Sequence, residues 1–295
     1  MRTLSASFAT IALVLLCPVA GAQMPATNPM PDGSSDMYVG LGAVSMPRYA
    51  GADERRVRLL PVLQAQWSNG IFVSGMNAGW HLSTQPVLEY GPLLSLDPGR
   101  DDGGAGGSAI GIQRLTGVGN LPNMPVALVQ YNAKVLSTGN RLNGLPSIGR
   151  RVQAGAFLNI YLAPTLRLTS RVLYGAGNDH NGATLHAGLQ AMGFHPAPQH
   201  TITFEGEVGL ANRKYNQAFF GINNDESLTS GNPLFDAHGG WQDARVGASW
   251  HWAWSPAWML VSSLDVTRQL GATRQSPLVT RPTGASVSTA LAFRF

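Results

Sequence analysis

The chain has 295 residues, of which 12% are charged and 44% are hydrophobic. Ordinary globular domains carry charge on roughly a quarter of their residues, so the surface of this protein is poor in charge. The formal net charge is +4 and no segment concentrates lysine and arginine, which argues against a nucleic-acid partner. The 35 glycines and seven tryptophans are typical of a β-rich chain with tight turns and aromatic anchors.

The first 22 residues have the three parts of a secretory signal peptide. Arg2 supplies a positive start, residues 8–16 are apolar but too few to span a bilayer, and Ala20-Gly21-Ala22 is an A-x-A cleavage site. We therefore predict export and cleavage after Ala22. The only cysteine, Cys17, lies inside this segment, so the mature chain would hold together without disulfides, as expected of a bacterial envelope protein.

Short segments with alternating polar and apolar residues fill the rest of the chain. Residues 23–35 are rich in proline, asparagine and serine and are predicted to form a flexible periplasmic leader. Residues 36–295 are predicted to form one domain, because strand-like segments recur to the end and no apolar stretch is long enough for a membrane helix. The predicted strands are 37–46, 58–67, 71–81, 86–96, 125–137, 151–163, 166–176, 183–194, 201–213, 241–254, 257–269 and 284–295.

The alternation assigns two faces to most strands. In the segment 201–213, Phe204 and Val208 fall on one face, whereas Thr203 and Glu207 fall on the other. The strands of a soluble β-sandwich also alternate between polar and apolar residues. The lengths of the connections must therefore decide between a sandwich and a membrane barrel. From the sixth strand onward short and long connections mostly alternate, as periplasmic turns and extracellular loops do in an outer-membrane protein. We predict an all-β fold, an antiparallel transmembrane β-barrel of about twelve strands, with ten and fourteen as alternatives.

Aromatic residues support a membrane location. Trp250, Trp252, Trp254 and Trp258 lie at the end of one predicted strand and the start of the next, where a girdle of indole rings is expected at the level of the lipid headgroups. In a soluble protein they would have to form a core cluster. The last strand has an apolar face that ends in three residues, which we predict to be the signal for the barrel assembly machinery: Leu291, Phe293 and Phe295.

Charged residues on the polar faces are predicted to point into the barrel. Pairs of opposite sign could brace the barrel across its lumen, and unpaired charges could instead line a selective pore. The mixture of signs favours bracing. The residues are Lys134, Arg167, Arg171, Glu205, Glu207, Arg245 and Asp265.

No pattern in the sequence predicts catalysis or metal binding. His186 and His251 could act as bases for Ser249, Ser263 or Ser288, but no motif connects them, and ordinary polar lumen residues are the simpler interpretation. One aspartate and one histidine in the loop 177–182 do not fill a coordination sphere. We expect neither an enzyme nor a cofactor.

Several motifs, in order, resemble the MltA-interacting protein (MipA/OmpV) family. They are G-L-G-A-V-S-M-P-R-Y-A-G-A-D-E-R-R (40–56), L-P-V-L (60–63), G-P-L-L-S-L-D-P-G-R-D-D (91–102), F-F-G-I (219–222), S-G-N-P (230–233), G-G-W-Q-D (239–243), S-P-L-V (276–279) and the terminal A-F-R-F. The resemblance spans nearly all of the mature chain. It implies a Gram-negative outer-membrane protein that contacts membrane lipids and, in the best-known case, acts as a scaffold for a murein-degrading lytic transglycosylase and a murein-synthesising penicillin-binding protein.

The expected function is therefore a non-enzymatic scaffold for peptidoglycan enzymes. The alternatives are a narrow channel for small solutes or antibiotics and an adhesin-like surface protein. The long segment 97–124 breaks the alternation of connection lengths, because it would lie on the periplasmic side. We predict that it carries a docking element at the periplasmic rim: Gly99, Arg100, Asp101 and Asp102.

Overall fold

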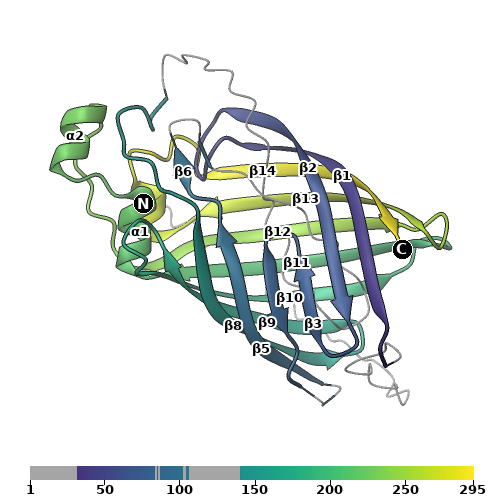
Figure 1. Ribbon diagram of the computed structural model, residues 1–295. Helices are drawn as coiled ribbons and strands as arrows, with labels where there is room; N and C mark the ends of the chain where they lie inside the picture. The colour runs from purple at the N-terminus through teal and green to yellow at the C-terminus, as the bar shows by residue number, and fades with distance from the viewer. Residues whose placement is uncertain (1–31, 84, 86, 102–103, 106–139) are drawn as a thin grey trace, which may run out of the picture.

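Twelve antiparallel strands close into one barrel (Figure 1). The computed structural model describes residues 32–83, 85, 87–101, 104–105 and 140–295. The last strand pairs with the first and thereby closes the sheet, which confirms the predicted fold class. The strands are β1 (Ser35–Pro47), β2 (Arg55–Trp67), β3 (Ile71–Ser74), β4 (Asn77–Trp80), β5 (Leu88–Asp97), β8 (Arg151–Ala163), β9 (Leu166–Ala176), β10 (Gly182–Phe194), β11 (His200–Ala211), β12 (Gly240–Trp252), β13 (Trp258–Gln269) and β14 (Thr283–Arg294).

The apolar face of the strands points outward and the polar face points inward. In β11 the side chain of Phe204 is 50% exposed, whereas Thr203 is 3% and Glu207 9% exposed. The same inversion of the soluble pattern holds in β2, where Val57 and Leu59 are exposed. Apolar side chains outside and backbone groups paired around a closed sheet are what a bilayer requires.

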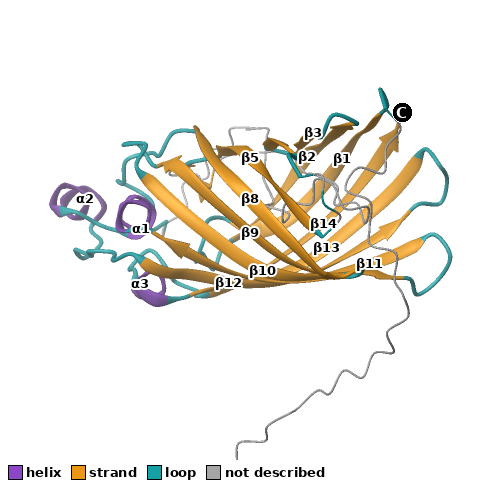
Figure 2. Ribbon diagram, turned by 90° about the horizontal axis from the view of Figure 1, so that it is seen from below, coloured by secondary structure: helices purple, strands orange, loops and turns teal. Residues whose placement is uncertain are grey.

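The two ends of the barrel differ. At one end, which we call the turn rim, the connections contain between two residues (164–165) and seven residues (81–87). The C-terminus lies at this rim, where the backbone N–H of Phe295 donates to the carbonyl of Met37 at 3.2 Å. The other end, the loop rim, carries the long connections and three short helices: α1 (Arg213–Phe220), α2 (Asn224–Ser230) and α3 (Gly271–Gln275) (Figure 2).

One predicted strand is wrong. The segment 71–81 forms two short strands, β3 and β4, which are joined by a tight turn at Gly75, a residue with a φ of 58°. This extra reversal sends β5 toward the loop rim, where its register partner at Asp97 is Arg151 of β8. The predicted strand 125–137 lies outside the described residues.

The long connections pack together at the loop rim. Five buried side chains from four separate connections form an apolar cluster, which we call the loop cap: Tyr49, Ala52, Leu142, Ile222 and Leu278. The Tyr49 hydroxyl donates to the carbonyl of Leu278 at 3.1 Å. Two further strands, β6 (Arg100–Asp101) and β7 (Gly104–Ala105), form a separate small sheet. Within the described residues, each helix is too short or too polar to cross a membrane.

Candidate functional site in the barrel lumen

A cluster of buried polar side chains around Glu89 spans several neighbouring strands on the lumen side of the barrel wall. The Glu89 carboxylate accepts from Asn159 at 3.0 Å and from the Tyr161 hydroxyl at 2.9 Å. It also forms an ion pair with Arg167, whose side chain is fully buried, at 3.1 Å. The Nε atom of Arg167 donates to Gln190 at 2.8 Å. We call these residues the Glu89 cluster; sequence analysis found Arg167 but missed Glu89, although Glu89 lies on the inward face of β5.

A second cluster contains four of the predicted lumen charges. Glu207 contacts Arg171 and His186, each at 3.2 Å, and Arg245 at 3.4 Å. Arg245 also contacts Glu205 at 3.4 Å. We call these five residues the Glu207 cluster. Asp265 lies beside it, because a Cβ atom on Gly247 would meet both the Asp265 carboxylate and Glu205.

These ion pairs run along the wall and not across the lumen. The cations and anions of the Glu207 cluster come from β9, β10, β11 and β12, which are consecutive neighbours in the sheet. Arg167 and Glu89 belong to β9 and β5, which are separated only by β8. The expectation that opposite charges brace the barrel from side to side is therefore corrected, and Lys134 lies outside the described residues. These described pairs join nearby strands of the wall, and they do not connect opposite sides of the lumen.

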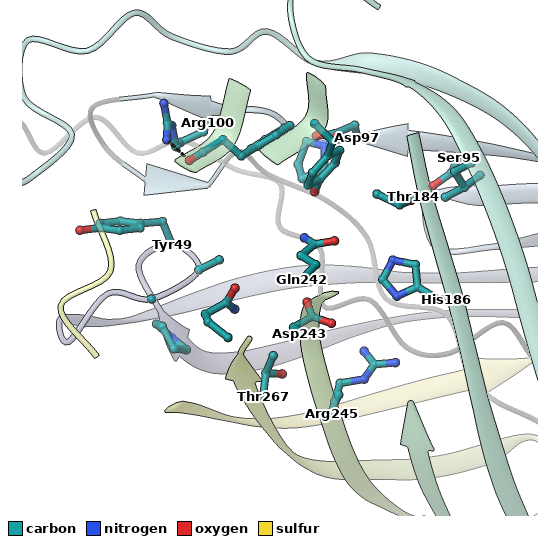
Figure 3. Close-up of a pocket in the computed structure, with 18 of the residues that line it drawn as sticks. Tyr49, Ser95, Asp97, Arg100, Thr184, His186, Gln242, Asp243, Arg245 and Thr267 are labelled. Atoms are coloured by element: carbon teal, nitrogen blue, oxygen red, sulfur yellow. Dashed lines mark hydrogen bonds between the residues drawn. The ribbon is translucent and has the colours of Figure 1, made fainter. Parts of the chain in front are cut away.

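A cavity of about 320 Å³ lies between the loop cap and the Glu207 cluster (Figure 3). Its apolar lining includes Met46, Tyr215 and Phe219, and its polar lining includes Asp97 and Asp243. The tip of Asp243 occupies space above a glycine, since a Cβ atom on Gly209 would lie 2.7 Å from its Oδ1 atom. Sequence analysis did not single out Asp243, although alternation places it on the same face of β12 as Arg245. The register shift between Gly209 and Leu210 instead turns the next residue, Gln242, inward.

The described docking residues lie at the loop rim, the end of the barrel that carries the long connections. Gly99 has a φ of 70°, and its N–H donates to Asp97 at 2.7 Å. Arg100 is buried, its guanidinium donates to the carbonyl of Phe219 in α1, and its backbone pairs with Ile148. Burial lowers the pKa of Arg100 to about 10, which leaves the side chain charged. Asp101 belongs to β6, and Asp102 lies outside the described residues. Arg100 thereby joins the segment after β5 to α1 and to Ile148.

The four tryptophans form part of a continuous aromatic arc at the turn rim. Trp250 and Trp252 both stack on His200, Trp252 contacts Trp254, and Trp254 stacks on Trp258 at 6.5 Å between ring centroids. The arc continues from Trp258 to the end of the chain through two phenylalanines, Phe293 and Phe295. Its members lie on the outer face, where Trp258 is 40% and Phe295 67% exposed. Leu291 is also exposed on this face.

The candidate catalytic residues are only partly brought together. His251 Nε2 lies 3.3 Å from the Ser249 hydroxyl, whereas Ser263 contacts Asp265 at 3.3 Å and Ser288 at 2.8 Å. Within the described residues no ion pair or hydrogen bond joins His251 to a carboxylate, and His186 contacts Glu207 and not a serine. The described residues also contain no group of three or more potential metal ligands.

The chain is similar to one family of known proteins and, in fold, to several solved outer-membrane proteins. A family model described as MltA-interacting protein MipA matches residues 39–295. Among solved structures the chain is similar to a bacterial polysaccharide outer membrane secretin, with a TM-score of 0.45, 8% identity and coverage of 90% of this chain and 100% of that chain. It is also similar to the NanC porin, with a TM-score of 0.43, 11% identity and coverage of 89% and 100%. For the toluene transporter TodX of Pseudomonas putida the TM-score is 0.37, the identity 10% and the coverage 92% and 91%. No curated protein matches the sequence.

Proposed function

The chain belongs to the MltA-interacting protein MipA family, and from this membership we propose that it is a non-enzymatic scaffold that holds a murein-degrading lytic transglycosylase at the outer membrane. The location itself follows from a closed antiparallel barrel with an apolar outer face, the architecture of Gram-negative outer-membrane proteins. A murein-synthesising penicillin-binding protein is the proposed second partner. The family match is the observation that carries the proposal.

The turn rim is the proposed docking face. Long connections of outer-membrane barrels face the cell exterior and short turns face the periplasm, where murein lies. The loop rim, including Gly99 and Arg100, is then on the wrong side for a periplasmic enzyme. Two of the short turns have exposed residues: 195–199 directly precedes His200 of the aromatic arc, and 253–257 contains its member Trp254.

Capture of a purified lytic transglycosylase by the detergent-solubilised barrel tests the proposal. We expect capture by the unaltered protein and its loss when the turns 195–199 and 253–257 are both replaced by glycine–serine linkers of equal length. The matched control replaces the α2 region, 223–231, at the loop rim, and should retain capture. Failure of the unaltered barrel to capture the enzyme would contradict the scaffold. Loss of capture only in the α2 replacement would contradict the turn rim as its docking face.

A narrow channel for small solutes is the second candidate function. It is favoured by the course of the ion pairs along the wall and by the cavity of about 320 Å³ inside the barrel. Planar-bilayer recordings distinguish the two candidates. Discrete current steps that scale with salt concentration would support the channel, whereas a silent bilayer with retained enzyme capture would support the scaffold.

A further inference from the structure

The outer face of the barrel contains very little charge, and that charge is confined to one place. Among the lipid-facing positions of the twelve described barrel strands, lysine, arginine, aspartate and glutamate occur only as Arg55 of β2 and Arg268 of β13. Arg55 shares the exposed face of Val57 and Leu59. Arg268 shares the exposed face of Leu264. Both arginines lie at the loop-rim ends of their strands.

This end of the outer face is the level of the lipid headgroups. Two exposed aromatic side chains mark it: Trp241 at the start of β12 is 53% exposed, and Tyr174 near the end of β9 is 57% exposed. Tryptophan and tyrosine are enriched at membrane interfaces. A charge on the lipid face is costly at the middle of the bilayer and costs little near the interface. The two arginines are therefore placed where they meet headgroups and not acyl chains.

The two arginines lie close together on the outer face. The strands β2, β1, β14 and β13 are consecutive in the sheet (Figure 1). The Arg55 side chain reaches across β1, because its Nη1 atom donates to the carbonyl of Ala285 in β14 at 2.6 Å. Ala285 pairs with Val266 of β13, two residues before Arg268. Strand spacing and rise then separate the backbones of Ala285 and Arg268 by about 8 Å, so both guanidinium groups can reach one headgroup.

The positive charge of this pair is not neutralised by the protein. Within the described chain, neither the Arg55 nor the Arg268 guanidinium pairs with a carboxylate, and the acceptors of Arg55 are the Ala285 carbonyl and the carbonyl and hydroxyl of Ser45. The nearest acidic residue along the chain, Glu54, pairs with Arg48 at 2.7 Å. The hydrogen bonds of Arg55 fix its position and leave its charge available to an anion outside the protein.

We propose that Arg55 and Arg268 hold the phosphate group of a phosphorylated lipid in the leaflet that surrounds the loop rim. A guanidinium fork suits phosphate oxygens, and basic side chains at a membrane surface attract anionic headgroups. The outer surface between the two arginines carries only small side chains, Ser45, Thr283 and Ala285, which leave room for a headgroup. The acyl chains lie along the apolar face below. The site is separate from the proposed docking face, which lies at the turn rim.

Native mass spectrometry of the detergent-solubilised barrel tests the proposal with two lipids that have the same acyl chains, dimyristoyl phosphatidate and dimyristoylglycerol. We expect phosphatidate to bind at least about tenfold more tightly than the diacylglycerol. Arg268→Gln and Arg55→Gln should each weaken phosphatidate binding at least about fivefold. Arg150→Gln is the matched control and should retain the affinity, because Arg150 is exposed immediately before β8, which lies opposite β14 in the order of the strands. Heat-dependent migration in gels verifies that each variant has assembled.

The remaining outcomes decide against the proposal. Equal binding of the two lipids would show that the acyl chains, and not the phosphate, are recognised. Unchanged affinity in Arg268→Gln would exclude this part of the wall, even if Arg55→Gln fails to assemble because its guanidinium joins β2 to β14. Displacement of phosphatidate by millimolar inorganic phosphate would identify a site for free anions and not for a lipid.

Discussion

The buried ion pair between Glu89 and Arg167 makes Glu89 a sensitive residue. Replacing Glu89 by glutamine keeps the size of the side chain and one acceptor oxygen, but turns the other oxygen into an amide donor and removes the anion that lies 3.1 Å from Arg167. A buried cation that loses its counter-ion is strongly destabilising. We expect Glu89→Gln to lower the free energy of unfolding by about 3 kcal/mol, measured by urea denaturation in lipid vesicles.

Glu54 provides the control for this measurement. Its carboxylate pairs with Arg48 at 2.7 Å, but the Glu54 side chain is 47% exposed. Solvent screens such pairs, so Glu54→Gln should change the free energy of unfolding by less than about 1 kcal/mol. Equal effects of the two substitutions would mean that water in the lumen screens the Glu89–Arg167 ion pair as effectively as solvent screens the exposed Glu54–Arg48 pair.

A glycine in β8 is expected to tolerate no side chain. A Cβ atom on Gly155 would overlap the backbone carbonyl of Val172 in the neighbouring strand β9, and a backbone atom cannot move aside cheaply. Gly155→Ala should therefore destabilise the barrel by at least about 2 kcal/mol or prevent folding. Gly206→Ala is the matched control, since a Cβ atom there meets nothing within 4 Å. The urea midpoints of the two variants check the prediction, and similar midpoints would refute it.

Sequence patterns predict the face of a lumen residue better than its partner. Alternation placed Arg171, Glu205 and Glu207 inside, because a period of two follows directly from strand geometry. Their partners depend on which residues lie opposite in neighbouring strands, and this register is not visible in one sequence. Sequence analysis likewise gave no role to Glu89 or to Asp243, although Asp243 shares the face of Arg245. The shifted register near Gly209 concealed the inward position of Gln242.

Among the elements, the long strands were predicted and the short ones were not. Strands such as β8 and β11, with 13 and 12 residues, contain enough alternations to stand out. β3 and β4 have four residues each, and only two residues, Gly75 and Met76, separate them. The missed reversal shifted one connection to the opposite rim and with it the predicted docking residues. Helices α1 and α2 are too short to be stable alone and depend on their caps, Asn212 and Asn223, and on tertiary packing.

The C-terminal strand offers a test of the assembly signal. Phe295 is 67% exposed and stacks on Phe293, so its replacement should change the stability of the folded barrel little. Phe295→Ala should nevertheless lower the amount of barrel assembled in cells several-fold, because the terminal aromatic is the predicted recognition signal. Phe194→Ala is the control, since Phe194 ends β10 at the same rim and is 58% exposed. The measurement is the amount of heat-modifiable protein in outer membranes. A similar yield of Phe295→Ala and Phe194→Ala would show that Phe295 is not the recognition signal.

At the scale of the whole molecule, the orientation of the barrel decides which functions are open to each end. A periplasmic enzyme can reach only the periplasmic rim, whereas solutes from outside first meet the exterior rim. The assignment of the loop rim to the exterior follows from connection length. The loop cap and the cavity beneath it would then face incoming solutes. The aromatic arc would lie at the periplasmic interface of the outer membrane.

Cysteine labelling tests this orientation without interference from other thiols. Cys17 is the only cysteine and lies in the segment predicted to be removed on export. Leu228→Cys in α2 is at the loop rim, where Leu228 is 85% exposed, and Pro198→Cys is in an exposed turn at the turn rim. A membrane-impermeant maleimide should label Leu228→Cys on intact cells, and Pro198→Cys only after the outer membrane is permeabilised. The reverse pattern would place the loop rim in the periplasm, move the cavity away from external solutes, and make the loop rim, with Gly99 and Arg100, the face available to murein enzymes.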